Sequence, residues 1–291
     1  MTDAINQFRA ALSARGILAP IEIRADGVLH RCDAEGKGGK KDAAYLLHLD
    51  GIPAGGFENH RDGLGWENWR ADIGRVMTPA EEAEHRAKVE AQRKQREIEQ
   101  ARRHAEARKR AGLILAEAYP GEHPYVLKKH IQPYGAKVIE AEKARAIASN
   151  LSPELAGLLL VIPVRADSVL TSLQFITADS VKRPLTGGKM AGGYYAIGTM
   201  RGAAALAICE GFATGATIHE ATGYPVAVAF SAGNLMAVAQ AMRAKFPDLT
   251  LILCADDDHG TPGNPGLTKA TEAARAVGGV VAVPEFGRAA S

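Results

Sequence analysis

Short apolar runs alternate with longer amphipathic stretches in the last third of the chain. The runs are about five residues long and the stretches about 10 to 14, which is typical of strands and helices in a parallel sheet covered on both faces. The predicted strands are 205–209, 226–230, 250–255 and 279–283, and the predicted helices are 213–222, 233–246 and 264–277. Such a doubly wound α/β unit binds its ligands beyond the carboxyl ends of the strands.

A second pattern, polar on nearly every side, covers residues 78–112. It begins with Thr78-Pro79-Ala80-Glu81, a capping box with proline in the first turn, and no further Gly or Pro occurs before Gly112. Val89 and Ile98 are its only large aliphatic residues before Arg110. Because such a helix has no apolar face to bury, we expect an exposed connector. Its basic residues either contact phosphates or form charge pairs along a solvated spacer.

Residues 113–199 follow the connector and predict a mixed α+β segment. Two apolar runs, 158–165 and 169–176, predict antiparallel strands, and a glycine-rich stretch, 182–195, follows them. Glycine lets a backbone approach phosphate closely, so this stretch is a candidate for nucleotide or template binding. The alternative is an ordinary glycine-rich hairpin with surface lysines.

The first 77 residues predict a small α+β module. The expected elements are a helix over 8–17 and strands over 21–31, 43–49 and 55–59. Trp66 and Trp69 are both tryptophans of the chain. Two interpretations stay open: the tryptophans form the core of the module, or they stack the bases of single-stranded DNA beside basic residues.

Charge is distributed unevenly over these four segments. The whole chain carries 35 basic and 33 acidic residues, so it is not a polycation. The net charges of 1–77, 78–112, 113–199 and 200–291 are −1, +3, +2 and −2. This distribution fits a protein whose basic middle part binds a polyanion and whose acidic C-terminal part binds a divalent metal.

Several classes of protein are excluded by what the sequence lacks. No apolar run approaches the roughly 20 residues of a membrane span, and the first residues do not resemble a secretory signal. The three cysteines, at 32, 209 and 254, form no CxxC pair, which argues against a zinc ribbon and a disulfide framework. We therefore expect a reduced, cytoplasmic protein without a membrane partner.

Acidic residues follow two of the predicted strands in the C-terminal unit. Glu210 comes directly after 205–209, and Asp256, Asp257 and Asp258 come after 250–255. Residues two apart in an extended chain share a side, so Asp256 and Asp258 can converge with Glu210 on a magnesium ion. One acid at a strand end is usually a helix cap, but clustered carboxylates repel one another unless a cation neutralises them.

The acids and the residues around them resemble a known family. Glu210 on one strand and Asp256-x-Asp258 on another are similar to the Toprim domain of primases, topoisomerases and related nucleases. Glu210-Gly211-Phe212-Ala213-Thr214-Gly215 resembles the Glu-Gly-Tyr-Ala-Thr-Ala motif of primases from plasmids and satellite phages. Further similar motifs are His123-Pro124-Tyr125, Leu173-Gln174-Phe175-Ile176, Lys182-Arg183, Gly187-Gly188-Lys189, Ala232-Gly233-Asn234-Leu235 and Asn264-Pro265-Gly266. The resemblance implies a Rossmann-like Toprim domain over 200–291.

The resemblance also implies roles for residues of this chain. Glu210 is expected to help deprotonate the attacking 3′ hydroxyl, and Asp256 and Asp258 to hold Mg²⁺, with Mn²⁺ as an alternative metal. Asp257 is a further candidate for an outer metal contact. Candidates for nucleotide or DNA binding are Lys182, Arg183, Lys189, His123, Tyr125 and Lys128.

The function implied is that of a DNA primase, a nucleotidyltransferase that makes short RNA primers on single-stranded DNA from ribonucleoside triphosphates. Its setting would be the replication or transfer of a plasmid or another mobile element. The sequence contains no Walker A motif, so we expect any helicase to be a separate partner. Two alternatives stay open: a Toprim nuclease that cleaves DNA or RNA, and a DNA-binding accessory protein without catalytic turnover.

Overall fold

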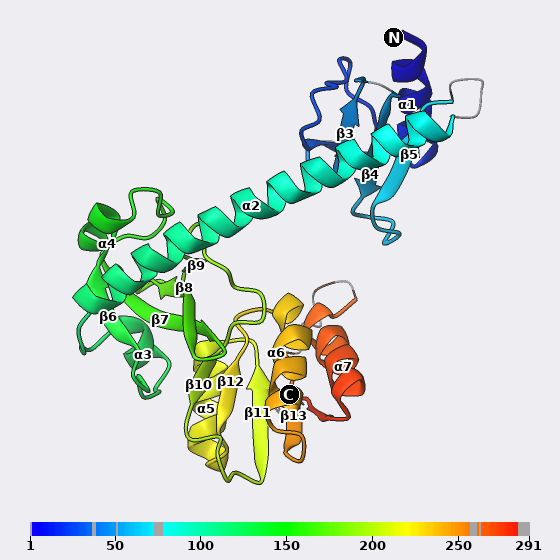
Figure 1. Ribbon diagram of the computed structural model, residues 1–291. Coiled ribbons are helices and arrows are strands. Elements are labelled where there is room, and N and C mark those ends of the chain that lie inside the picture. The colour runs from blue at the N-terminus through cyan, green and yellow to red at the C-terminus, as the bar shows by residue number, and fades with distance from the viewer. Residues whose placement is uncertain are drawn as a thin grey trace. The chain divides into compact units, whose positions relative to one another are not determined.

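The computed structural model describes residues 2–36, 39–50, 52–72, 78–256, 261 and 263–284. The chain divides into two compact units, Met1–Gln95 and Arg96–Ser291. The boundary falls within one helix, α2 (Pro79–Glu117), so each unit contains part of it (Figure 1).

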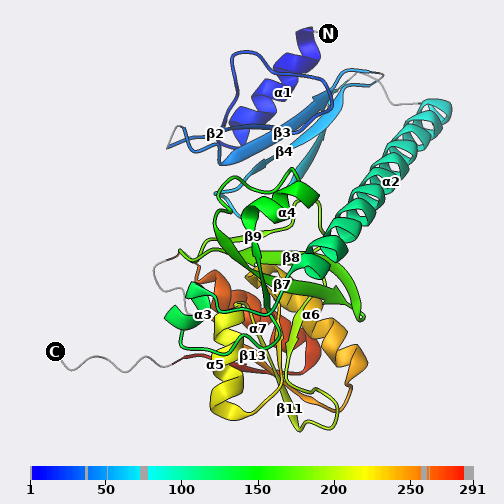
Figure 2. The same cartoon turned by 90° about the vertical axis from the view of Figure 1, so that its left-hand side faces the viewer.

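The first unit contains an antiparallel sheet with one helix, α1 (Thr2–Ala14), along one face (Figure 2). The sheet has the order β1-β2-β3-β4-β5. Phe8 of α1 lies at the centre of the core, where its ring contacts three aromatic rings of the sheet at centroid distances of 4.9 to 6.0 Å. The strands are β1 (Ile17–Leu18), β2 (His30–Ala34), β3 (Ala43–His48), β4 (Ala54–Asn59) and β5 (Glu67–Arg70).

Two predicted elements of this unit differ from the structure. The helix expected over 8–17 begins earlier and ends at Ala14, because Gly16 has a left-handed φ of 66° and turns the chain into β1. The strand expected over 21–31 is mostly irregular. Asp26 accepts a hydrogen bond from the backbone N–H of Val28 (3.0 Å) and so forms a turn ahead of β2.

Helix α2 is longer than the predicted connector, and its C-terminal part is not fully exposed. Ion pairs such as Glu99–Arg103 (3.1 Å) join its charged side chains along one helical turn. Beyond them, Ala107, Ala111 and Ile114 are completely buried. Small side chains at this spacing make a face that lies close against the neighbouring sheet, so the helix continues past Gly112 into the core of the second unit.

An antiparallel sheet of order β6-β7-β8-β9 forms the first layer of the second unit. Alternate residues of its strands face two different cores. Leu159 of β7 and Phe175 of β8 contact the buried end of α2, whereas Leu160 and Ile176 face the C-terminal sheet. The elements of this layer are α3 (Pro124–Lys128), β6 (Lys137–Glu140), α4 (Ala141–Ile147), β7 (Leu158–Ala166), β8 (Val169–Ile176) and β9 (Lys182–Pro184).

The C-terminal sheet has the order β10-β12-β11-β13-β14 and is parallel except at β10. Helices α6 and α7 cover one face, and α5 lies on the other (Figure 1). The predicted α/β class with a parallel C-terminal sheet is therefore confirmed. The elements are β10 (Tyr195–Ile197), β11 (Ala205–Cys209), α5 (Phe212–Thr222), β12 (Val226–Val228), α6 (Ala232–Lys245), β13 (Thr250–Cys254), α7 (Pro265–Val277) and β14 (Val280–Ala282).

Strand β10 comes from the segment that the sequence assigned to a separate subdomain, 113–199. It pairs antiparallel with β12 and extends the C-terminal sheet at its edge. Residues 96–291 therefore form one unit, in which the two layers share a core. Among the helices of the described chain, none has an apolar stretch long enough to cross a membrane.

Candidate active site

Two of the predicted acids lie at neighbouring strand ends of the C-terminal sheet. Strands β11 and β13 pair in parallel, with Ile208 opposite Leu253, so Glu210 and Asp256 follow adjacent strands at the same edge. Both residues are half-buried, and the Oε1 atom of Glu210 is shielded from solvent. Asp257 and Asp258 lie outside the described residues.

A lysine from the other layer lies close to both acids. Lys182 begins β9, and its Nζ atom is 3.8 Å from the position that a Cβ on Gly211 would take. Desolvation of the ammonium group lowers the pKa of Lys182, and the charges of Asp256 and Glu210 act in the opposite direction. The side chain as a whole is exposed, so the desolvation concerns its charged end at the loop after β11. Lys129 lies close enough to lower that pKa further.

The next residue of the same strand points away from the acids. Arg183 is paired with Phe175 on β8, on the sheet face opposite the acids, and its guanidinium lies 2.5 Å from the carboxylate of Glu154. Lys182 is paired with Ile176, on the face that contacts the C-terminal sheet. Strand alternation therefore separates two basic residues that the sequence treated as one group. Lys128 and Lys189 are exposed.

Two of the remaining predicted site residues are part of the core. His123 is completely buried, caps α3 by accepting the Tyr125 backbone N–H (3.1 Å), and lies 3.1 Å from the Leu158 carbonyl oxygen. Burial lowers the pKa of His123. Tyr125 is 1% exposed. This corrects the expectation that His123 and Tyr125 contact nucleotide or DNA, because neither side chain reaches the surface.

Two cysteines, far apart in sequence, lie side by side beneath the acids. Cys209 ends β11 and Cys254 ends β13, one residue beyond the last registered pair, and both face the same core. Burial raises the pKa of the Cys254 thiol to about 11, with a further contribution from the charge of Asp256. The pKa of Cys209 is also raised, first by burial. Both thiols are therefore protonated at neutral pH and form part of the apolar floor of the site.

The glycine-rich stretch has a structural explanation. Gly187 and Gly192 have left-handed φ angles of 81° and 71°. A Cβ on Gly188 would lie 2.0 Å from the Ser172 Oγ, and one on Gly193 would lie 2.5 Å from a methyl carbon of Val164. Turns and close contact with β7 and β8 account for all four glycines, so they do not argue for a phosphate-binding loop.

Asn234 holds this stretch against the C-terminal sheet, a role that the sequence did not indicate. Its side chain is buried in the first turn of α6. The Nδ2 atom lies within hydrogen-bond distance of the carbonyl oxygens of Met190 (3.2 Å), Gly193 (2.8 Å) and Ala229 (2.8 Å), and Oδ1 accepts the Gly192 N–H (2.8 Å). One side chain thus ties the loop after β9 to the end of β12. The sequence signal that could have indicated this role is an amide residue shortly after a third predicted strand, 226–230.

Gly266 determines how closely α7 approaches the acidic edge. A Cβ at this position would lie 2.4 Å from the backbone carbonyl oxygen of Asp256. No side chain fits there unless Asp256 moves, so the Asn264-Pro265-Gly266 sequence allows the first turn of α7 to lie against the acid.

The donors at this edge suit a magnesium ion. Glu210 and Asp256 offer carboxylate oxygens, and Mg²⁺ is usually held in enzymes by one or two carboxylates together with substrate phosphates and water. Within the described ranges, no group of three or more potential metal ligands is present. The pair fits a metal that is completed by a nucleotide and does not resemble a closed structural site.

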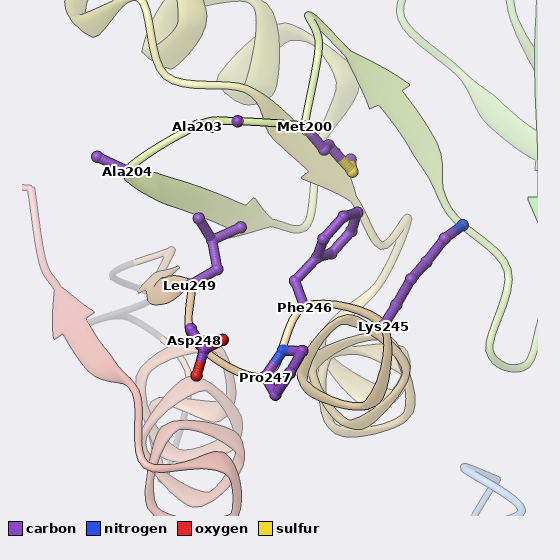
Figure 3. Close-up of a pocket in the computed structure, with 9 residues that line it drawn as sticks. Met200, Ala203, Ala204, Lys245, Phe246, Pro247, Asp248 and Leu249 are labelled. Atoms are coloured by element: carbon purple, nitrogen blue, oxygen red, sulfur yellow. The ribbon is translucent and has the colours of Figure 1, made fainter.

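A cavity of about 360 Å³ lies at the opposite end of the sheet (Figure 3). Its lining comes from the segments that lead into β11 and β13, including Ala203 and Leu249. Parallel strands place those segments at the amino edge, whereas the acids lie at the carboxyl edge. The cavity therefore does not belong to the acidic site.

Comparison with known proteins shows what the sequence of the chain is similar to. Residues 205–287 match the Toprim domain. Two proteins of Escherichia coli, each described as DNA primase TraC, are similar along nearly the whole chain. One is 38% identical over 298 residues, which cover 97% of this chain and 26% of that protein. The other is 35% identical over 298 residues, which cover 96% of this chain and 19% of that protein. The chain thus spans about a quarter or less of these relatives, and no solved structure matches it.

Proposed function

Because the chain carries a Toprim domain and resembles plasmid-type primases along nearly its whole length, we propose that it is the catalytic part of a DNA primase. The reaction is the magnesium-dependent joining of ribonucleoside triphosphates into a short RNA on single-stranded DNA. The observation that carries this proposal is the convergence of Lys182 on Glu210 and Asp256. Two carboxylates with a lysine beside them suit phosphoryl transfer, in which negative charge must be both oriented and neutralised.

Each group has a distinct part in the proposed reaction. Glu210, half-buried at the strand end, accepts the proton of the attacking 3′ hydroxyl. Asp256, together with Asp258, would hold Mg²⁺, which when bound neutralises charge on the phosphates and orients them. Lys182 contacts the triphosphate from the opposite layer. The exposed Lys128 and Lys189 are proposed contacts for template phosphates, which would make binding sensitive to salt. Arg183 has no such part in the proposal, because it points away from the acids and is paired with Glu154.

A single incubation tests the reaction class. The protein is mixed with single-stranded DNA, labelled ribonucleoside triphosphates and Mg²⁺, and the products are separated by length. Labelled oligoribonucleotides support the proposal. Shortened DNA would instead identify a nuclease, and retarded DNA without any product would identify a binding protein.

The two basic residues of β9 are expected to differ sharply in their effects. Lys182→Ala removes a charge beside the acids, so we expect kcat/KM for nucleotide incorporation to fall about a hundredfold. Arg183→Ala serves as the matched control on the opposite face, where its partner is Glu154. We expect no more than about a fivefold loss, since an exposed ion pair is worth at most about 1 kcal/mol. Steady-state rates of primer synthesis at varied nucleotide concentration give kcat/KM for both variants. Equal losses would contradict the conclusion that Lys182 points towards the acids and Arg183 away from them.

Gly266→Ala is expected to disturb the position of Asp256 without changing any chemical group of the site. The added methyl overlaps the Asp256 backbone, and a displacement of about 1 Å costs roughly a hundredfold in rate. Gly233→Ala is the matched control, because it lies in the first turn of α6 and a Cβ there meets nothing within 4 Å. Rates of primer synthesis and melting temperatures of both variants measure the effect. Comparable activity in the two would show that the contact with α7 does not position the acid.

A further inference from the structure

On the face of the N-terminal sheet opposite α1, which we call the open face, the side chains lie in rows across the strands. Phe57 and Tyr45 face α1 and belong to the core, so their neighbours along β4 and β3 face outwards. The strand registers place these outward residues in three rows across the sheet. The rows are Arg31–Ala44–Glu58, Leu46–Gly56–Asn68 and His48–Ala54–Arg70.

The two tryptophans of the chain have different surroundings. Trp69 packs against Phe8, with ring centroids 4.9 Å apart, and belongs to the core. Trp66 is 42% exposed and lies on the open face. A Cβ on Gly56 would be 2.5 Å from the indole Nε1, so glycine makes room for the ring in the middle row. Nε1 donates a hydrogen bond to Asn68 Oδ1 (3.1 Å), which fixes the orientation of the indole. The indole of Trp66 is therefore held by its contacts with β4 and Asn68 while part of the ring stays exposed to solvent.

Basic residues lie at opposite corners of this face. Arg31 and Arg70 occupy the two outer rows, on either side of the row with Gly56. Within the three rows Glu58 is the single carboxylate, and its oxygen lies 3.3 Å from the imidazole of His60. His60 also contacts the Arg31 guanidinium (2.6 Å). Each row has a small residue at its centre, Ala44, Gly56 or Ala54. With histidine neutral, the two arginines and Glu58 give the three rows a net formal charge of +1, and Asp50 lies beside the end of one outer row, 3.2 Å from His48.

We propose that this face binds single-stranded DNA, with one base stacked on Trp66 and flanking phosphates against Arg31 and Arg70. A sheet face with an anchored, exposed aromatic ring and flanking arginines is complementary to an unpaired base and its backbone. The choice of DNA as the occupant rests on the proposed primase function, since the template is single-stranded DNA. The face belongs to the unit that does not contain the acids.

Intrinsic fluorescence of the full chain tests this directly, because both tryptophans lie in the N-terminal unit. We expect oligo(dT) to quench the emission of the exposed Trp66 as it binds, and duplex DNA of the same length to quench it far less. Absence of quenching at oligonucleotide concentrations that saturate binding by fluorescence anisotropy would overturn the proposal. So would equal quenching by duplex DNA, whose paired bases cannot stack on the ring.

Substitutions then assign the effect to the ring. We expect Trp66→Ala to weaken binding of labelled oligo(dT) about tenfold, whereas Trp66→Phe retains a stacking ring and stays within about threefold. Leu64→Ala is the matched control, since Leu64 lies two residues away and is 75% exposed without an aromatic ring. Unchanged affinity in Trp66→Ala, with an unchanged melting temperature, would overturn the proposal. Quenching in a Glu210→Gln variant keeps the result independent of primer synthesis.

Discussion

Glu210→Gln is expected to abolish primer synthesis, with a fall in rate of about a thousandfold or more. The substitution keeps the size and shape of the side chain but removes the negative charge and the proton acceptor. Glu210 follows β11 directly, and its charge acts on Lys182 from the same edge of the sheet as that of Asp256. Asp256 lies at the same edge but is assigned to the metal, so we do not expect it to replace Glu210 as the proton acceptor.

The measurement is the amount of labelled oligoribonucleotide formed per unit time on single-stranded DNA. Glu220→Gln is the matched control, because Glu220 lies near the other end of α5 and accepts hydrogen bonds from the Gln132 N–H (2.9 Å) and the Tyr134 hydroxyl (3.1 Å). A glutamine retains the oxygen for both bonds, so synthesis should stay near the normal rate. If Glu210→Gln keeps more than a tenth of the activity while DNA binding is normal, the assignment of Glu210 is wrong.

Asn234→Ala is expected to destabilise the second unit by about 3 kcal/mol. The amide is 7% exposed and contacts three carbonyl oxygens and one N–H, all of which lose the Asn234 side chain on truncation. Of these, the Met190 carbonyl oxygen keeps a second partner, the Gly193 N–H (2.9 Å). Buried groups left without hydrogen bonds cost about 1 to 3 kcal/mol each, and partial relaxation of the loop recovers some of this. For a unit of this size the melting temperature should fall by about 10 °C.

Urea denaturation and thermal melting measure this loss. The control is Asn150→Ala, which removes one exposed hydrogen bond from the Arg110 guanidinium (3.0 Å) and should cost less than about 1 kcal/mol. Because Asn234 holds the loop after β9, primer synthesis by the folded variant should also decrease. A destabilisation below about 1 kcal/mol would mean that the loop is held by other contacts.

The sequence predicted the C-terminal sheet and the acidic residues of the site because both depend on local pattern. Strands buried on both faces must be continuous apolar runs, so β11 and β13 were visible together with the acids that follow them. Parallel strands of one sheet present their carboxyl ends at one edge, so Glu210 and Asp256 were expected to meet. Resemblance to the Toprim primases followed from the same residues and is confirmed by the comparisons.

Other features depended on contacts between residues distant in sequence. Strand alternation and pairing with β8 turn Lys182 towards the acids and Arg183 away from them. Two adjacent basic residues in a sequence do not indicate which of them faces the acids. Burial of His123 and exposure of Trp66 likewise depend on which elements cover each position. Local pattern therefore determined the strands and helices of the C-terminal sheet and the edge that carries the acids. Only tertiary structure decided which side chains face that edge, because burial and direction are set by packing partners from elsewhere in the chain.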